Sequence, residues 1–246
     1  MNNLMKAEFF RLRHTGFLKL IILLDLTAVF FQFVGDEGLE INAHSFFFHA
    51  MMGFSMALCC TSCIVCSTFN DRCAYYEVMK GTPPIQMILY RIIITLSLVT
   101  AVYFLPTVIL LKISDGENFT LPMILLLFVC IAKLTVFFVS MCVIFNGVVG
   151  TILAMLMVVF NSMPLVILQN IAHINVVPLT SYLTTTQIML IGDLPMLDLE
   201  EIALPLDTSY TGLKVVISFI VLSALMILAA NKLLRDRKQF DALSAD

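Results

Sequence analysis

Charged side chains are scarce in this sequence, since Asp, Glu, Lys and Arg make up 13% of its 246 residues, whereas 60% are hydrophobic. Typical soluble domains are about 25% charged and about 45–50% apolar. A soluble fold of this length could not cover so much apolar surface. A bilayer accommodates it, because lipid tails are as apolar as leucine. The net charge of −3 and the lack of a rich basic cluster exclude nucleic acid as an expected partner.

Motifs for catalysis and cofactor binding are also missing. No stretch matches the GxxxxGK[ST] loop that holds the phosphates of ATP, and no HExxH zinc motif occurs. Glu200 and Glu201 form an acidic pair without the downstream arginine of an intramembrane protease. His44 and His49 are interpreted as polar residues at a membrane surface. We therefore expect no enzymatic activity, no metal and no cofactor in this chain.

The cysteines do not form a secreted disulfide framework, because the seven are odd in number and most lie within apolar runs. Cys60, Cys63 and Cys66 have a CxxCxxC spacing that can ligate an iron–sulfur cluster. The expected fourth ligand position holds Asn70, which cannot serve. Small side chains let helices approach closely in lipid, so we interpret this run as a packing surface.

Six apolar runs are long enough, or nearly so, to cross a bilayer as helices, which takes about 20 residues. Their apolar residues are continuous rather than alternating, which favours helices over barrel strands. The sequence therefore predicts an all-α integral membrane protein with six transmembrane helices. The runs are Phe17–Val34, Phe46–Thr68, Ile92–Leu111, Leu121–Phe145, Val148–Leu168 and Leu213–Ala230.

The distribution of basic residues predicts the orientation. A cytoplasmic N-terminus places eleven of the fourteen Lys and Arg residues on the cytoplasmic side. Lys112 and Lys214 fall outside, and Lys133 lies within a span. Because cytoplasmic loops are enriched in Lys and Arg, we expect both termini in the cytoplasm.

Two cytoplasmic segments outside the spans carry their own patterns. In segment 1–16, Met5, Phe9 and Leu12 form a narrow apolar stripe among charges, which indicates an interfacial helix. An ordinary basic flank of the first span is the alternative. Segment 69–86 is polar and could form a short helix that ends at Gly81. A plain connecting loop is the alternative there.

Segment 169–212 is acidic and is expected outside the cell. Pro178, Pro195 and Pro205 divide it into pieces too short to cross the membrane, yet it is too apolar for a plain loop. We expect one or two helices that enter the outer leaflet or pack on the mouth of the bundle.

Asp25 and Lys133 lie inside predicted spans. A charge there costs a few kcal/mol unless it is paired or hydrated. The two residues have opposite signs and similar depths. We consider two hypotheses: an ion pair across the bundle, or a solvated path lined by Lys133.

Three stretches resemble a known family. Met5–Arg13 is similar to an N-terminal elbow helix, Tyr76–Arg91 to a cytoplasmic loop with the entry of the third span, and Pro178–Tyr182 to the stretch before re-entrant helices. Together the layout resembles the six-span membrane subunits of ABC exporters. Arg91 stands where lysine is commoner in that family. The small size is similar to bacterial permeases that export bacteriocins, lantibiotics or amphipathic peptides.

The resemblance implies a single transmembrane permease domain over residues 1–246, in a bacterial cell membrane. It implies export of a hydrophobic or amphipathic substrate, a second permease, identical or related, and a separate cytoplasmic ATPase dimer that binds ATP and Mg. An immunity or accessory protein that binds a toxin and moves nothing is the alternative. The residues expected to couple to the ATPase are Asp71, Arg72, Tyr75, Tyr76, Glu77 and Lys80.

Overall fold

The structure, a computed structural model, is predominantly helical. It describes residues 2–35, 38–39, 41, 43–67, 82–114, 119–145, 147–161, 177–192, 196–199, 202–205 and 209–243. The helices are α1 (Asn2–His14), α2 (Phe17–Phe31), α3 (Ala43–Cys66), α5 (Pro84–Val99), the π-helix η2 (Thr100–Phe104), α6 (Leu105–Ser114), α7 (Leu121–Phe145), α8 (Gly147–Val159), α10 (Val177–Thr180), α11 (Thr184–Ile191) and α12 (Thr211–Leu243). The strands are β1 (Val34–Gly35), β2 (Gly38–Leu39), β3 (Met196–Leu199) and β4 (Ile202–Pro205).

Four helical stretches of the described chain are long and apolar enough to cross a membrane: His49–Cys66, Pro84–Ser114, Leu121–Phe145 and Thr211–Asp236. A fifth is added if α1 and α2, which meet at an angle of 83°, are counted as one bent span. These helices identify a multi-pass membrane protein. The described part of α8 is a shorter apolar helix of 13 residues, so helix length alone does not establish six spans.

The first two helices meet at Gly16, whose φ of 76° is a left-handed value that favours glycine. The helix expected in segment 1–16 is present as α1. Of its predicted apolar stripe, Leu12 is buried, whereas Phe9 is half exposed. Arg11 fixes α1 to the end of α3 by donating a hydrogen bond of 3.2 Å to the Ile64 carbonyl. Cations are favourable at a helix C-terminus, where carbonyls lack helical partners.

The third apolar run forms a longer helix than predicted. It extends from Pro84 to Ser114 rather than from Ile92 to Leu111, so the last residues of segment 69–86 belong to α5. Proline is well suited to the first turn of a helix because its missing N–H needs no partner there. The π-helix η2 interrupts the α-helix, and its Tyr103 donates a hydrogen bond to Gln32, which follows the end of α2.

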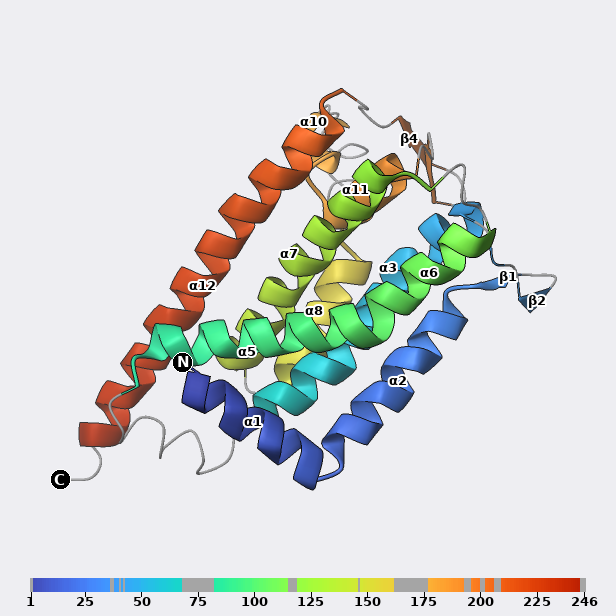
Figure 1. Cartoon of the computed structure of the whole chain (residues 1–246). Helices are drawn as coiled ribbons and strands as arrows, with labels where there is room; N and C mark the ends of the chain where they lie inside the picture. Colours follow the sequence, from blue (N-terminus) through green and yellow to red (C-terminus); the bar gives the residue numbers. More distant parts are fainter. Residues whose placement is uncertain are drawn as a thin grey trace.

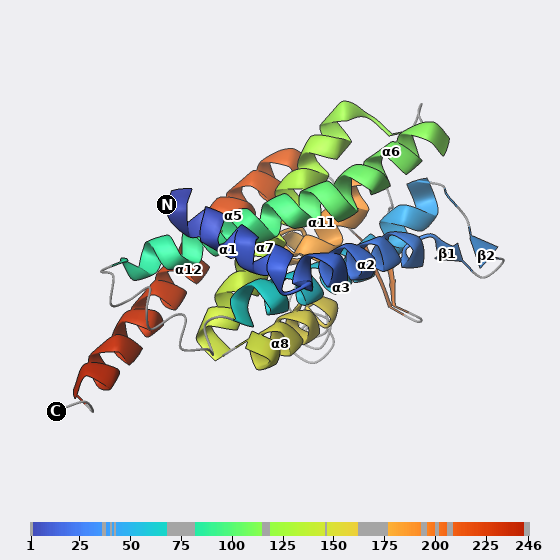
Figure 2. The ribbon, with the colours of Figure 1, turned by 60° about the horizontal axis from the view of Figure 1, so that its bottom comes forward.

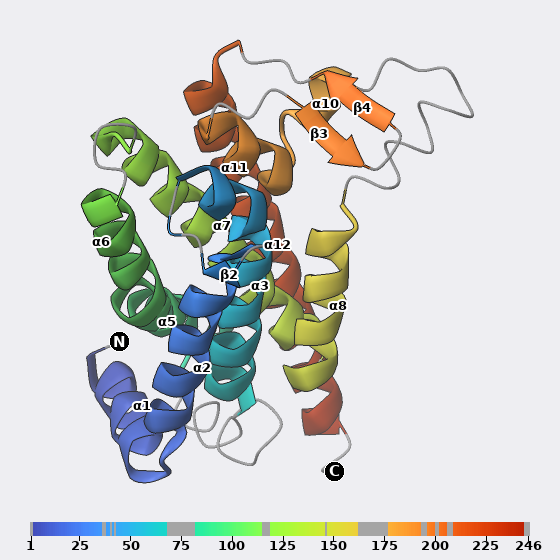
Figure 3. The same ribbon diagram turned by 90° about the vertical axis from the view of Figure 1, so that its right-hand side faces the viewer.

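Helix α7 lies at the centre of the bundle and packs against α3, α5, α8, α11 and α12. Successive long helices run in opposite directions, and the start of α1 and the end of α12 lie at one end of the bundle (Figures 1 and 3). The β3–β4 hairpin lies at the other end, at the top of Figure 3. Close packing of α7 and α8 depends on Gly150, whose Cα faces the α7 backbone at Met141 and Cys142.

In the described part of segment 169–212, the expected one or two helices are present, and a hairpin that the sequence did not predict accompanies them. Helices α10 and α11 form, but β3 and β4 pair as an antiparallel hairpin, with Met196 opposite Pro205. The runs between Pro195 and Pro205 are too short for a stable helix, and the hairpin satisfies their backbone groups instead. Helix α11 contacts α3, α7, α8 and α12, and its Ile188 and Ile191 are buried in the main core.

Candidate functional site

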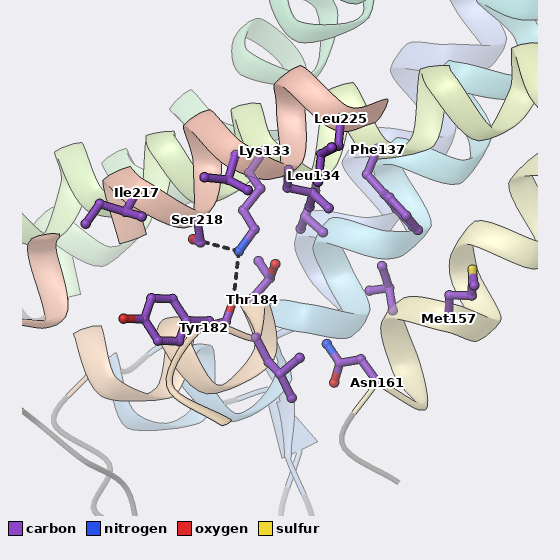
Figure 4. Close-up of a pocket in the computed structure, with 14 residues that line it drawn as sticks. Lys133, Leu134, Phe137, Met157, Asn161, Tyr182, Thr184, Ile217, Ser218 and Leu225 are labelled. Carbon is purple, nitrogen blue, oxygen red and sulfur yellow. Dashed lines mark hydrogen bonds between the residues drawn. The ribbon is translucent and has the colours of Figure 1, made fainter. Parts of the chain in front are cut away.

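The most prominent candidate site is a cavity of about 550 Å³ formed by side chains of α7, α8, α11, α12 and the turn before α11 (Figure 4). Apolar side chains form most of its wall. Among the described residues that line it, Lys133 is the only charged one. A ligand cavity of this size, mostly apolar with a few polar groups, is typical of small-molecule sites. The apolar lining residues are Leu134, Phe137, Met157, Val158, Leu183, Ile217, Val221, Leu222 and Leu225.

Lys133 is 2% exposed, and protein oxygens accept all three of its ammonium hydrogens. Its Nζ donates to the Tyr182 carbonyl at 3.1 Å, to Gln187 Oε1 at 3.0 Å and to Ser218 Oγ at 3.0 Å. Figure 4 shows the bonds to Tyr182 and Ser218 on the cavity wall. None of the three acceptors is charged, so within the described chain this cation is hydrogen-bonded only to neutral dipoles.

Gln187 and Ser218 extend the contact into a network that joins α7, α11 and α12. The Gln187 Nε2 donates to the Ser181 carbonyl at 3.2 Å and to Ser218 Oγ at 3.0 Å. Ser218 Oγ lies 2.9 Å from the Val215 carbonyl of its own helix, to which it can donate. Sequence reasoning identified Lys133 but missed both partners. The one available signal was an amide side chain, Gln187, beside the apolar run 188–191.

Asp25 has a separate environment on α2. It is fully buried, and the Thr61 hydroxyl of α3 lies 3.1 Å from each of its carboxylate oxygens. Helix α3 packs against both α2 and α7. Among the described residues, no salt bridge joins Asp25 to Lys133. The structure therefore does not bring Asp25 and Lys133 together as an ion pair.

Because Asp25 and Lys133 share no partner, their substitutions should act independently. The losses in unfolding free energy for Asp25→Asn and Lys133→Gln are expected to add within about 0.5 kcal/mol. Unfolding by SDS in mixed micelles measures both single variants and the double variant. A reversed pair, Asp25→Lys with Lys133→Asp, should not recover the lost stability. Recovery by the reversed pair would mean that the two charges interact.

The sequence matches no family model, no curated protein and no solved structure. The exporter class thus remains a resemblance carried by the sequence stretches described above.

The residues expected to couple to an ATPase, 71–80, lie outside the described residues. The helix ends that flank them, Cys66 of α3 and Pro84 of α5, lie at the same end of the bundle as the termini (Figure 1). Arg91 lies near that end on α5. It is buried, donates to the Met87 carbonyl at 3.1 Å and lies 4.6 Å from the centre of the Tyr90 ring.

The cysteines of the CxxCxxC run lie on α3 as free thiols. Among the described residues, no group of three His, Cys, Asp or Glu side chains could hold a metal ion. Cys66 is buried with Cys142 of α7 in a small apolar cluster. This contact agrees with the interpretation of the run as a helix-packing surface.

Proposed function

We propose that this chain is the membrane subunit of an ATP-driven ABC exporter in a bacterial cell membrane. Its substrate is hydrophobic or amphipathic, such as a peptide. The observation that carries the proposal is the cavity around Lys133, which combines a long apolar wall with one fixed cation. An amphipathic molecule needs both features, because its apolar part must leave water while its polar end keeps hydrogen-bonding partners.

In this proposal six segments cross the membrane: α2, α3, α5–α6, α7, α8 and α12. Helix α1 is an interfacial elbow, and both termini are cytoplasmic. The alternating helix directions and the common end of the two termini support this topology (Figure 1). The 13 residues of α8 span about 20 Å of the roughly 30 Å hydrocarbon core. The apolar run predicted from the sequence continues to Leu168, and its part after residue 161 lies outside the described residues.

The cavity wall indicates how such a substrate would bind. Leu134, Phe137 and Leu225 offer apolar contact along one side. A carboxylate or carbonyl oxygen on the substrate would approach Lys133 and Ser218, displacing one of the neutral oxygens from the ammonium group. A charged acceptor forms a stronger bond than a neutral one, which favours substrates with an anionic end.

The energy source would be a separate ATPase dimer that binds ATP and Mg, since the sequence has no phosphate-binding loop. Residues 71–80 would dock on it. A second permease, identical or related, would complete the path. Helix α12 is the most exposed of the four long apolar helices, which supports its contact with lipid or with that second permease.

Purification of the full chain from native membranes in mild detergent tests the proposal. An ATPase should co-purify in stoichiometric amount and hydrolyse ATP. Deletion of Tyr75–Lys80, or Glu77→Gln, should abolish its recovery. A matched control, Glu40→Gln on the predicted extracellular side of the membrane, should leave recovery of the ATPase unchanged. Recovery of the chain alone in every case would contradict the proposal and favour a membrane immunity protein that binds a toxin without moving it.

A further inference from the structure

A second groove, of about 520 Å³, lies between α1 and α5, away from the cavity around Lys133. Helix α1 runs beside α5 near the start of the chain (Figure 2). The groove is lined by Met5, Phe9 and Phe10 of α1 and by Ile94 and Leu98 of α5. Both aromatic rings are at least half exposed. In a soluble protein these rings would be in water, whereas at a bilayer surface they lie at the depth of the upper acyl chains.

Two basic side chains complete the lining of the groove, and no acidic one does. Lys6 and Arg13 are seven residues apart on α1, so they lie on the same face about two turns apart, with Phe9 and Phe10 between them. Both are exposed, and neither has a hydrogen bond or ion pair within the described chain. The nearby acid, Glu8, is buried and bound to Arg11. The groove is therefore electropositive.

We propose that this groove binds one anionic phospholipid of the leaflet that faces the termini. The phosphate lies between Lys6 and Arg13, while the Ser97 hydroxyl, also on the groove wall, donates to the Ile93 carbonyl at 2.7 Å. One acyl chain follows the apolar wall of Ile94 and Leu98. Charge complementarity selects the anionic headgroup, and the apolar wall selects a lipid over a soluble phosphate. This inference depends on the membrane location of the chain but not on its role as an exporter.

The bound lipid would stabilise the packing of α1 against the bundle. Within the described chain, α1 is fixed by Leu12 in a small core cluster and by the Arg11 contact with Ile64. The Leu12 cluster joins α1 to α2, α3 and α5, and its α5 members include Tyr90 and Ile94. Beside this cluster, the groove between α1 and α5 exposes Phe9 and Phe10, and a bound lipid fills it. Anionic lipid should therefore stabilise the position of α1.

The test uses the absence of tryptophan from the sequence. Phe9→Trp places the single tryptophan of the full chain in the groove. The protein is reconstituted into phosphatidylcholine vesicles that contain a low, equal mole fraction of either dibrominated phosphatidylglycerol or dibrominated phosphatidylcholine. Bromine quenches tryptophan on contact. We expect phosphatidylglycerol to occupy the groove with a relative affinity about 5-fold to 25-fold higher, since each basic residue near the surface contributes about fivefold.

Two double variants, each of which removes two positive charges, test whether the groove binds the anionic lipid. Lys6→Gln with Arg13→Gln should reduce the quenching by phosphatidylglycerol to that by phosphatidylcholine. Lys232→Gln with Arg235→Gln removes the same charge from exposed positions on α12 and should preserve the preference. Inorganic phosphate should relieve the quenching no more than chloride does at the same ionic strength. Equal loss in both variants, no preference in the parent, or displacement by phosphate would each overturn the proposal.

Discussion

Gln187→Leu should lower the free energy of unfolding by about 2–3 kcal/mol, the range for losing hydrogen bonds to a charged group. The substitution keeps the volume of the side chain but removes Gln187 Oε1, one of the three acceptors of Lys133. It also removes the donor to Ser218. The ammonium group is then left buried with an unpaired hydrogen, in a region where a cation is already costly. SDS unfolding of the full chain in mixed micelles measures the loss.

Lys133→Met should by itself have an effect on stability between a loss of about 0.5 kcal/mol and a gain of about 2.5 kcal/mol, because two effects oppose each other. Three neutral oxygens lose a donor, which costs about 1–3 kcal/mol. Removal of a cation from the membrane interior returns about 2.5–3.5 kcal/mol. The double variant, Lys133→Met with Gln187→Leu, should consequently be more stable than Gln187→Leu alone. Ser218 retains the Val215 carbonyl as an acceptor in that variant.

Gln86→Leu is the matched control, because it makes the same change at an exposed position on α5. Its stability should equal that of the parent. If Lys133→Met were as destabilising as Gln187→Leu and the two effects simply added, the network would be an ordinary set of independent contacts. The proposed role of Lys133 as the binding cation is a separate matter, tested by substrate-dependent ATPase activity in the Lys133→Met variant.

The helices were predictable because their signal is local. A continuous apolar run needs only its own residues to be recognised, and the predicted bounds of α2, α3 and α7 fall within a few residues of those observed. The start of α5 was missed for a physical reason. The sequence pattern predicts a helix end at Gly81 but gives no helix start just after it, whereas Pro84 begins α5, a position that suits proline.

The partners of Lys133 could not be predicted from the sequence. Its three acceptors come from the turn before α11, from α11 and from α12, between 49 and 85 residues away. Similar depth suggested Asp25 instead. Depth in a membrane is one coordinate, and the lateral position of a helix is set by packing that a hydropathy pattern does not encode. Asp25 contacts Thr61 of α3, whereas Lys133 contacts groups before α11, on α11 and on α12, so the structure does not pair the two charges.

The second large effect on stability is expected from a substitution at the contact between α7 and α8. Gly150→Leu should destabilise the bundle by about 3 kcal/mol, the upper range for inserting atoms into a well-packed interior. A Cβ at this position would meet Met141 O and the Cys142 Cα, which are backbone atoms that cannot rotate away. Small residues permit this close approach of helices in lipid. Gly150→Ala should cost less, since alanine recovers about 1 kcal/mol of helix propensity.

Gly212 of α12 is the matched control, because the nearest atom to a Cβ there is Leu126 Cδ2 at an ordinary 3.8 Å. Gly212→Ala should therefore be neutral or slightly stabilising. Cys142 adds a local readout, as its thiol is fully buried at the contact. If α7 and α8 separate in Gly150→Leu, maleimide should label Cys142 faster than in the parent, as measured by peptide mass spectrometry. Unchanged labelling together with unchanged stability would mean that α8 does not pack on α7 at Gly150.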